Sequence, residues 1–169
     1  RGANGTTSEV QVRDPLNTVR DYRYERVKNR FSVTAEGLVS GTSANSSRWR
    51  FLDAKGFVES ERDFLGQVKN YSWDTERDVL RSFTEAVDQP ESRTTGITWH
   101  SQWRLPLLIA ESGRTTSYTY DGAGNPLTQT ITDTGAGGGT ARTTSWTYHP
   151  SGLVATEKAP NGAVTSYQY

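Results

Sequence analysis

The sequence contains no cysteine and no methionine among its 169 residues. Without cysteine there are no disulfides, no zinc-thiolate sites and no cysteine nucleophile. Because methionine is absent, we expect that the chain does not begin at a translation start and that it is a fragment or a processed piece of a longer protein. The absence of cysteine does not distinguish an oxidising from a reducing compartment.

Long apolar runs and an excess of charge of one sign are also missing. We find no apolar run of about 18 residues and no signal-peptide-like start, so we predict no membrane insertion and no recognisable signal peptide in this fragment. Lysine plus arginine and aspartate plus glutamate balance at 19 each. Bulk electrostatics therefore gives no reason to expect nucleic acid or an anionic membrane as a partner.

Aliphatic residues are scarce, and aromatic rings replace them. Hydrophobic residues make up 33% of the chain, whereas five Trp, eight Tyr and five Phe supply much of the apolar surface. The rings recur in an aromatic-x-aromatic pattern that we call an anchor, which occurs seven times. With one ring replaced by Ile97, its members are Tyr22, Tyr24, Trp49, Phe51, Tyr71, Trp73, Trp99, Tyr118, Tyr120, Trp146, Tyr148, Tyr167 and Tyr169. A repeating unit of about 21–22 residues with insertions is indicated.

Turn-forming residues recur before and after the anchors. The approach turns precede an anchor and the exit turns follow one, and Gly and Asn suit both because they adopt positive φ easily. The turn positions are Asp14, Asp53, Gly56, Gly66, Asp121, Gly124, Asn125, Gly152, Asn161 and Gly162. Strand and turn thus alternate about every ten residues, which predicts an antiparallel sheet extended hairpin by hairpin.

This alternation predicts an all-β fold with one continuous repeat region. Residues 1–13 form a terminal or joining segment, and residues 14–169 hold about six to seven hairpin repeats. The segment 74–88 also fits an amphipathic helix, but it occupies the place of a repeat's second strand, so we favour a strand. The Gly-rich run 133–140 is interpreted as a lengthened hairpin loop and 43–47 as a polar loop.

Catalytic, metal-binding and cofactor-binding sites are not predicted. His149 and His100 each stand where another repeat has a turn Asp, which leaves no independent histidine for a Ser-His-Asp arrangement. Two groups of closely spaced carboxylates are consistent with glycoside hydrolysis, but arginines lie beside them and a charged surface is the simpler interpretation. These carboxylates are Glu59, Glu61, Asp63, Asp74, Glu76 and Asp78. Asp121 with Asn125 lacks the further ligands of a calcium loop.

One copy carries a recognisable motif, Tyr118-x-Tyr120-Asp121-x-x-Gly124-Asn125-x-Leu-Thr. This copy resembles the tyrosine–aspartate (YD) repeats of Rhs proteins, which are related to shell components of insecticidal toxin complexes and to the repeats of teneurins. The resemblance extends from Asp14 to Tyr169, although copies 49–59 and 97–107 lack the Asp-Gly-Asn pattern. It implies a section of a long spiralling β-sheet shell that encloses a C-terminal toxin.

The resemblance also sets expectations for partners and location. It implies the remainder of the same shell and its toxin cargo as partners, with secretion-machine components as further candidates, and export from a bacterium. The self-cleaving region and the variable toxin of such proteins are not found in this chain. We therefore expect a non-enzymatic structural segment.

Two alternatives stay open at this stage. Exposed rings on a strand face can stack on sugars, which would make the chain an extracellular carbohydrate-binding or receptor-binding module. In the simpler interpretation, rings from successive copies stack on one another as a structural ladder. The enzymatic alternative rests on the grouped carboxylates.

Overall fold

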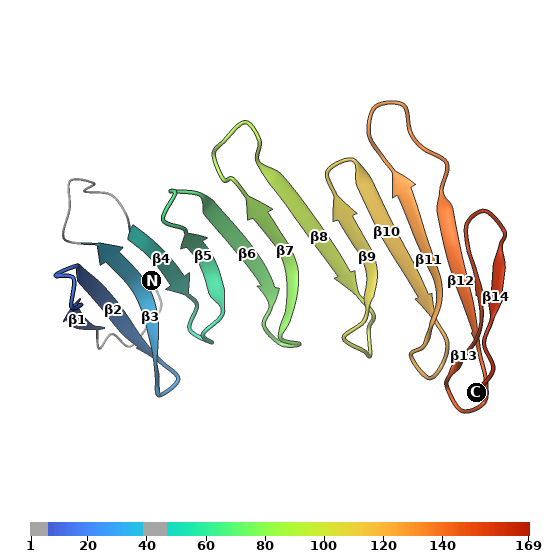
Figure 1. The fold of residues 1–169 in the computed structure, drawn as a ribbon, viewed down its shortest axis with the longest axis horizontal. Coiled ribbons are helices and arrows are strands. Elements are labelled where there is room, and N and C mark those ends of the chain that lie inside the picture. The colour runs from blue at the N-terminus through green and yellow to red at the C-terminus, as the bar shows by residue number, and fades with distance from the viewer. Residues whose placement is uncertain (1–6, 39–46) are drawn as a thin grey trace. The chain divides into compact units, whose positions relative to one another are not determined.

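The computed structural model describes residues 7–38 and 47–169, and these residues form fourteen β-strands and no helix. The chain divides into an N-terminal unit, Arg1–Arg93, and a C-terminal unit, Thr94–Tyr169. Within each unit every strand pairs antiparallel with the next one along the chain (Figure 1). The predicted all-β fold of antiparallel hairpins is therefore confirmed.

The N-terminal unit contains β1 to β7. Their bounds are Thr7–Arg13, Val19–Val27, Arg30–Leu38, Ser47–Leu52, Val58–Arg62, Val68–Asp74 and Val79–Glu85. β1 lies within the segment 1–13 and pairs with β2 over its full length. The ambiguous segment 74–88 contains β7, which confirms the strand. Of the expected polar loop 43–47, Ser47 begins β4 and residues 43–46 lie outside the described residues.

The C-terminal unit contains β8 to β14, with β8 beginning at the boundary. Their bounds are Arg93–Trp99, Pro106–Glu111, Arg114–Tyr120, Pro126–Asp133, Arg142–Tyr148, Val154–Lys158 and Val164–Ser166. The Gly-rich run joins β11 to β12, as expected of a lengthened hairpin loop. Within it, the Gly139 N–H donates to the Asp133 carbonyl.

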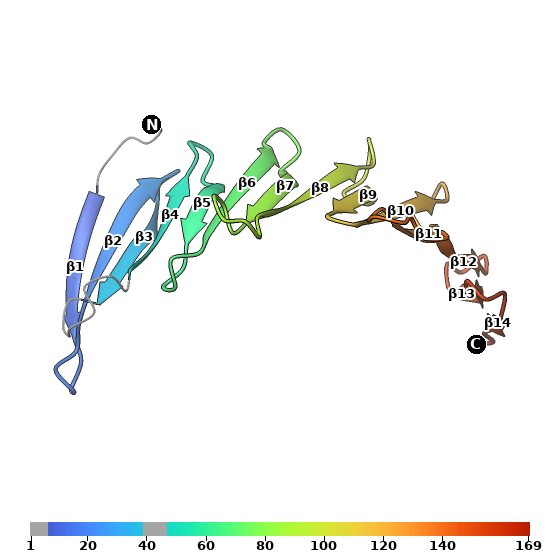
Figure 2. The same ribbon diagram turned by 90° about the horizontal axis from the view of Figure 1, so that it is seen from above.

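Each unit is a single layer of strands, as Figure 2 shows edge-on. Among the described residues only three hydrophobic side chains, Val19, Val27 and Val79, are buried. Larger side chains such as Trp73, Trp99 and Tyr118 are half-buried. Among these residues, none lies in a helix long and apolar enough to span a membrane. Stabilisation therefore has to come from contacts between neighbouring strands rather than from a core between layers.

The two faces of each unit differ in chemistry. Cross-strand partners share a face, and alternate residues of a strand point to opposite faces. We call the face that carries Tyr71 in the N-terminal unit, and Tyr118 in the C-terminal unit, the ring face of that unit, and the other its back face. On the back face of the C-terminal unit, threonine hydroxyls pair across strands, as in Thr119 with Thr128 at 2.6 Å and Thr147 with Thr156 at 2.7 Å.

A β-bulge recurs at the same place in successive hairpins. The register shifts between Arg23 and Tyr24, Phe51 and Leu52, Ser72 and Trp73, Thr98 and Trp99, Thr119 and Tyr120, and Thr147 and Tyr148. In each case the returning strand holds one extra residue opposite the second anchor position. Such a bulge bends the strand and increases its local twist.

Candidate functional site: the joint between hairpins

The anchor rings lie where β-strands approach the exit turns, and nearly all of them share the ring face. In the C-terminal unit, the cross-strand partners place Trp99, Tyr118, Tyr120, Trp146, Tyr148 and Tyr167 on one face. In the N-terminal unit, Tyr22, Tyr24, Tyr71 and Trp73 share a face in the same way.

The copy at Trp49 and Phe51 is a correction to the sequence analysis. Arg50 pairs with Glu61, which shares a face with Tyr71, so Trp49 and Phe51 point to the back face. The register shift also falls just before Leu52, where other copies place their second ring. Leu52 lies 21 residues before Trp73, the separation found between Trp99 and Tyr120. The anchor positions of this copy are therefore Arg50 and Leu52.

Six of the approach and exit turns share one geometry. In a five-residue turn, the N–H of the first residue donates to the carbonyl of the fifth, and the N–H of the fourth donates to the carbonyl of the first. This pattern begins at Asp14, Asp53, Asp63, Asp121, His149 and Ala159. The fourth residue has positive φ, between 69° and 88°, and is Asn17, Gly56, Gly66, Gly124, Gly152 or Gly162. A type I turn followed by a left-handed residue gives this geometry in hairpins.

The aspartate that opens four of these turns holds them closed with its side chain. One carboxylate oxygen of Asp121 accepts hydrogen bonds from the Ala123 and Asn125 N–H groups, both at 2.9 Å. The other accepts from the Asn125 side-chain amide at 2.9 Å, and these bonds, the Asn125 side chain first, lower the pKa of Asp121. The equivalent bonds recur at Asp14, Asp53 and Asp63.

Histidine replaces this aspartate in two exit turns, as the sequence suggested. The Nδ1 atom of His100 accepts from the N–H groups of Gln102 at 3.2 Å and Trp103 at 3.3 Å. His149 opens a turn of the common geometry. Asn161 serves a related purpose from the third turn position, where its Oδ1 accepts from the Ala163 N–H at 3.0 Å.

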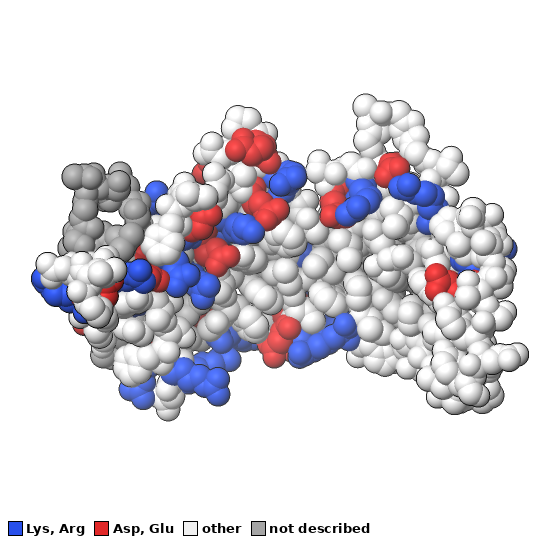
Figure 3. Space-filling model, in the orientation of Figure 1, with Lys and Arg blue, Asp and Glu red and all other residues white. Residues whose placement is uncertain are grey.

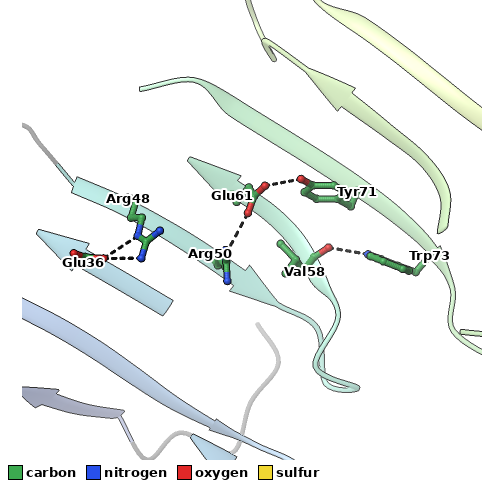
Figure 4. A network of polar contacts seen from close by, with 7 residues as sticks. All are labelled: Glu36, Arg48, Arg50, Val58, Glu61, Tyr71 and Trp73. Atoms are coloured by element: carbon green, nitrogen blue, oxygen red, sulfur yellow. Dashed lines mark hydrogen bonds and ion pairs between the residues drawn. The ribbon is translucent and has the colours of Figure 1, made fainter. Parts of the chain in front are cut away.

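In three copies, the second ring of an anchor forms a hydrogen bond with the first residue of the neighbouring strand, next to the preceding exit turn. The Tyr120 hydroxyl donates to the Pro106 carbonyl at 2.7 Å, and the Tyr148 hydroxyl donates to the Pro126 carbonyl at 2.7 Å. In the N-terminal unit, the Trp73 indole N–H donates to the Val58 carbonyl at 2.8 Å (Figure 4). We call this contact the ring-to-turn joint.

The second rings also pack against aromatic residues of the preceding exit turns. Trp73 stacks on Phe57 of the preceding exit turn at 4.9 Å between centroids. In the C-terminal unit, Tyr120 meets the edge of His100, and Tyr169 meets the edge of His149. Where these contacts occur, a ring touches the preceding turn. In these copies the rings contact turns, whereas the structural ladder expected from the sequence would stack the anchors of successive copies on one another. Tyr118 and Tyr120 stack within their own pair, with 6.3 Å between centroids.

A polar network crosses the ring face of the N-terminal unit. Glu36, which is buried, binds Arg48 at 2.7 Å, and Arg50 binds Glu61 at 3.2 Å (Figure 4). The Tyr71 hydroxyl donates to Glu61 at 2.5 Å, and burial together with this bond raises the pKa of Tyr71 to about 12. Figure 3 shows blue and red groups lying next to one another over this unit, whereas the C-terminal unit is largely white.

Three of the carboxylates considered for catalysis, Glu61, Asp63 and Asp74, have structural partners. The close spacing of Glu59, Glu61 and Asp63 in sequence suggests that they lie on one strand face, but Asp63 lies beyond the end of β5, in a turn. Asp74 accepts from the N–H groups of Glu76 and Arg77 and pairs with Arg81 at 3.2 Å. No group of three or more His, Asp or Glu residues suited to a metal ion occurs among the described residues.

Fold and joints together define a β-hairpin repeat protein. Residues 107–140, which include the Tyr118–Thr128 copy, match the family model of the RHS repeat. The predicted resemblance to Rhs repeat proteins is thereby confirmed. A search of curated proteins finds no match.

Solved structures give the same fold over most of the chain. The crystal structure of TcdB2-TccC3-TEV matches with a TM-score of 0.63 and 13% identity over 88% of this chain and 8% of that one. TcdB2-TccC3-Cdc42 matches with a TM-score of 0.64 and 12% identity over 95% of this chain and 10% of that one. The Tc holotoxin pore of Photorhabdus luminescens gives a TM-score of 0.62 and 11% identity over 90% of this chain and 9% of that one. The chain thus spans about a tenth or less of the structures it matches.

Proposed function

We propose that this chain is a section of wall in an Rhs-type shell that encloses a polypeptide toxin and helps to deliver it. The ring-to-turn joint carries the proposal. At Trp73, Tyr120 and Tyr148 it ties a hairpin to the preceding one on a single face, so the sheet extends without a second layer to cover it. A wall needs such local joints, whereas a ligand-binding domain needs a pocket built by distant segments.

The comparisons support the same assignment. The matched structures contain TcdB2 and TccC3 or belong to a Tc holotoxin, and their fold agrees with this chain over 88–95% of its length. On this proposal the partners are the remaining strands of the shell, its toxin cargo and components of a secretion machine, and the protein is exported. The outer strands β1 and β14 are the edges at which further strands of the shell pair.

The proposal assigns no catalysis to these residues. The carboxylates of Asp63 and Asp121 accept hydrogen bonds from N–H groups of their turns. Glu61 forms an ion pair with Arg50 and accepts a hydrogen bond from the Tyr71 hydroxyl. A general acid or base requires a carboxylate that faces a substrate. The anchor rings of the joints are likewise occupied, which disfavours them as a carbohydrate platform.

Protease protection in the complete gene product tests the shell. The enclosed polypeptide should resist added protease in the unaltered protein and become digestible when Tyr120 and Tyr148 are both replaced by Ala. The matched control is Tyr22→Ala, an anchor ring for which the described residues offer no hydrogen-bond partner. If protease digests the enclosed polypeptide equally in the unaltered protein and in the Tyr120→Ala, Tyr148→Ala variant, encapsulation is refuted.

A further inference from the structure

The turn between β13 and β14 contains the dipeptide Asn161-Gly162. Asn161 is the third residue of the five-residue turn that begins at Ala159, and Gly162 is the fourth, with a φ of +86°. Both residues are exposed, and no other asparagine of the described residues is followed by glycine. This turn therefore places an asparagine side chain next to a main-chain N–H group that no side chain shields.

The turn itself orients the asparagine side chain. The Asn161 Oδ1 accepts a hydrogen bond from the Ala163 N–H at 3.0 Å, and no described residue binds the Nδ2 atom. A donor at Oδ1 stabilises negative charge on that oxygen when a nucleophile adds to the Cγ carbon. The Cγ carbon is thus activated for attack, and the Nδ2 group is accessible to water because Asn161 is exposed.

Four other turns of this geometry are closed by an aspartate that this turn lacks. The Asp121 carboxylate accepts hydrogen bonds from two N–H groups of its own turn. The equivalent residue here is Ala159, whose side chain cannot accept one. The Gly162 N–H donates to the Ala159 carbonyl at 2.9 Å, so the turn has to open before the Gly162 nitrogen can react.

The position of the turn at the end of the sheet makes this opening easy. β14 has three residues, all of them exposed, and β13 is its one partner among the described strands (Figure 1). Short outer strands open at a lower free-energy cost than strands that are paired on both sides. The Asn161-Gly162 turn therefore reaches the open state more readily than a turn inside the sheet.

We propose that Asn161 is a site of spontaneous deamidation, made labile by the missing turn aspartate. In the open turn, the Gly162 nitrogen gives its proton to hydroxide and attacks the Cγ carbon of Asn161. The bond from Cγ to Nδ2 breaks, and the leaving nitrogen takes up a proton and departs as ammonia. Water then opens the resulting cyclic imide at either carbonyl. The products are aspartate and isoaspartate, and the net reaction consumes water and releases ammonia.

Isoaspartate alters the hairpin more than aspartate does. It routes the main chain through the former side chain, which adds an extra atom to the turn. The turn is closed by the Ala159 N–H, which donates to the Ala163 carbonyl at 2.8 Å, and this closure sets the register of β14 against β13. The isoaspartate form should therefore lose the pairing of β14. This chemistry belongs to one turn and does not depend on the shell function.

Incubation of the purified chain at mildly alkaline pH, followed by digestion and mass spectrometry, tests the proposal. The peptide that contains Asn161 should gain about 1 Da, and isoaspartyl methyltransferase should label it. Asn17 and Asn29 are internal controls, because both are exposed turn residues with positive φ but are followed by Thr18 and Arg30. Their peptides should keep their masses while most of Asn161 is converted.

A variant of the turn tests why this asparagine is labile. Ala159→Asp supplies the aspartate of the other turns and should slow the conversion about fivefold, the effect of one added hydrogen bond on turn opening. Gln168→Asp is the matched control, because it adds the same charge at an exposed position beyond β14 and should leave the rate unchanged. If Asn161 keeps its amide as long as Asn17 does, or if Ala159→Asp converts as fast as the unaltered chain, the proposal is refuted. Neither outcome affects the shell proposal, which protease protection tests.

Discussion

A single polar atom on each second ring decides whether it can complete a joint. The Tyr120 and Tyr148 hydroxyls and the Trp73 indole N–H all donate to the carbonyl of the first residue in the neighbouring strand. These carbonyls lie next to exit turns, where the strands have only begun to pair. The ring therefore supplies a donor that the strand ladder does not provide at this point.

Removing one hydroxyl should destabilise the C-terminal unit measurably. Tyr148→Phe is expected to lower the free energy of unfolding by about 1 kcal/mol, because the Pro126 carbonyl loses its donor while the ring stays in place. Urea denaturation followed by circular dichroism measures this change. Tyr22→Phe is the control and should change the stability by no more than about 0.5 kcal/mol. Equal effects of the two substitutions would contradict the role of the hydroxyl.

Tyr71 should make the stability sensitive to alkaline pH. Its pKa in the folded protein is about 12, above the ordinary value of 10.0. Because the folded pKa is raised, the stabilisation is complete below pH 10 and is lost as the pH rises towards 12. Absorbance at alkaline pH should show one tyrosine that ionises later than the others. Tyr71→Phe should remove that late step, and its persistence in this variant would assign it to another residue.

At the scale of the hairpin, the left-handed fourth residue of the turn sets the geometry. Gly124 has a φ of +88°, and a Cβ there would meet Leu105 at 3.5 Å. We expect Gly124→Ala to lower the free energy of unfolding by about 1 kcal/mol, since this conformation is unfavourable for residues with a Cβ. Gly122 in the same turn has no positive φ and open space around it. Gly122→Ala, measured by thermal denaturation alongside it, should be close to neutral.

The sequence predicts the order of strands and turns better than it predicts the face of the sheet on which each ring lies. Turn residues such as Asp121 and Gly124 act locally, so strand and turn order could be inferred from them, including the strand within 74–88. The spacing of Trp49 and Phe51 equals that of a true anchor, so the sequence predicts an anchor there, and only the register shows the one-residue offset that places both rings on the back face. The joints escaped prediction because their acceptors are main-chain carbonyls, which leave no residue signature.

At the scale of the whole chain, the exposed edges govern behaviour in solution. β1 is the outer strand of the N-terminal unit, and Val10 and Val12 on it are each 46% exposed. An open edge of this kind pairs readily with another strand. Size-exclusion chromatography of the isolated chain should therefore show assembly, which Val10→Lys together with Val12→Lys should reduce. A monomeric unaltered chain would contradict both the open edges and the shell.

The unequal turns also define where the chain tolerates new sequence. Second rings are separated by 21 residues between Trp99 and Tyr120 but by 28 between Tyr120 and Tyr148, and the extra length lies in the loop between β11 and β12. Each five-residue turn fixes the register of its own hairpin. Extra residues in the loop between β11 and β12 therefore do not change the register of the next hairpin. A foreign peptide inserted between Gly137 and Gly138 should leave the strands in phase. One residue inserted into the turn at Asp121 would instead rotate β11 out of phase with its neighbours.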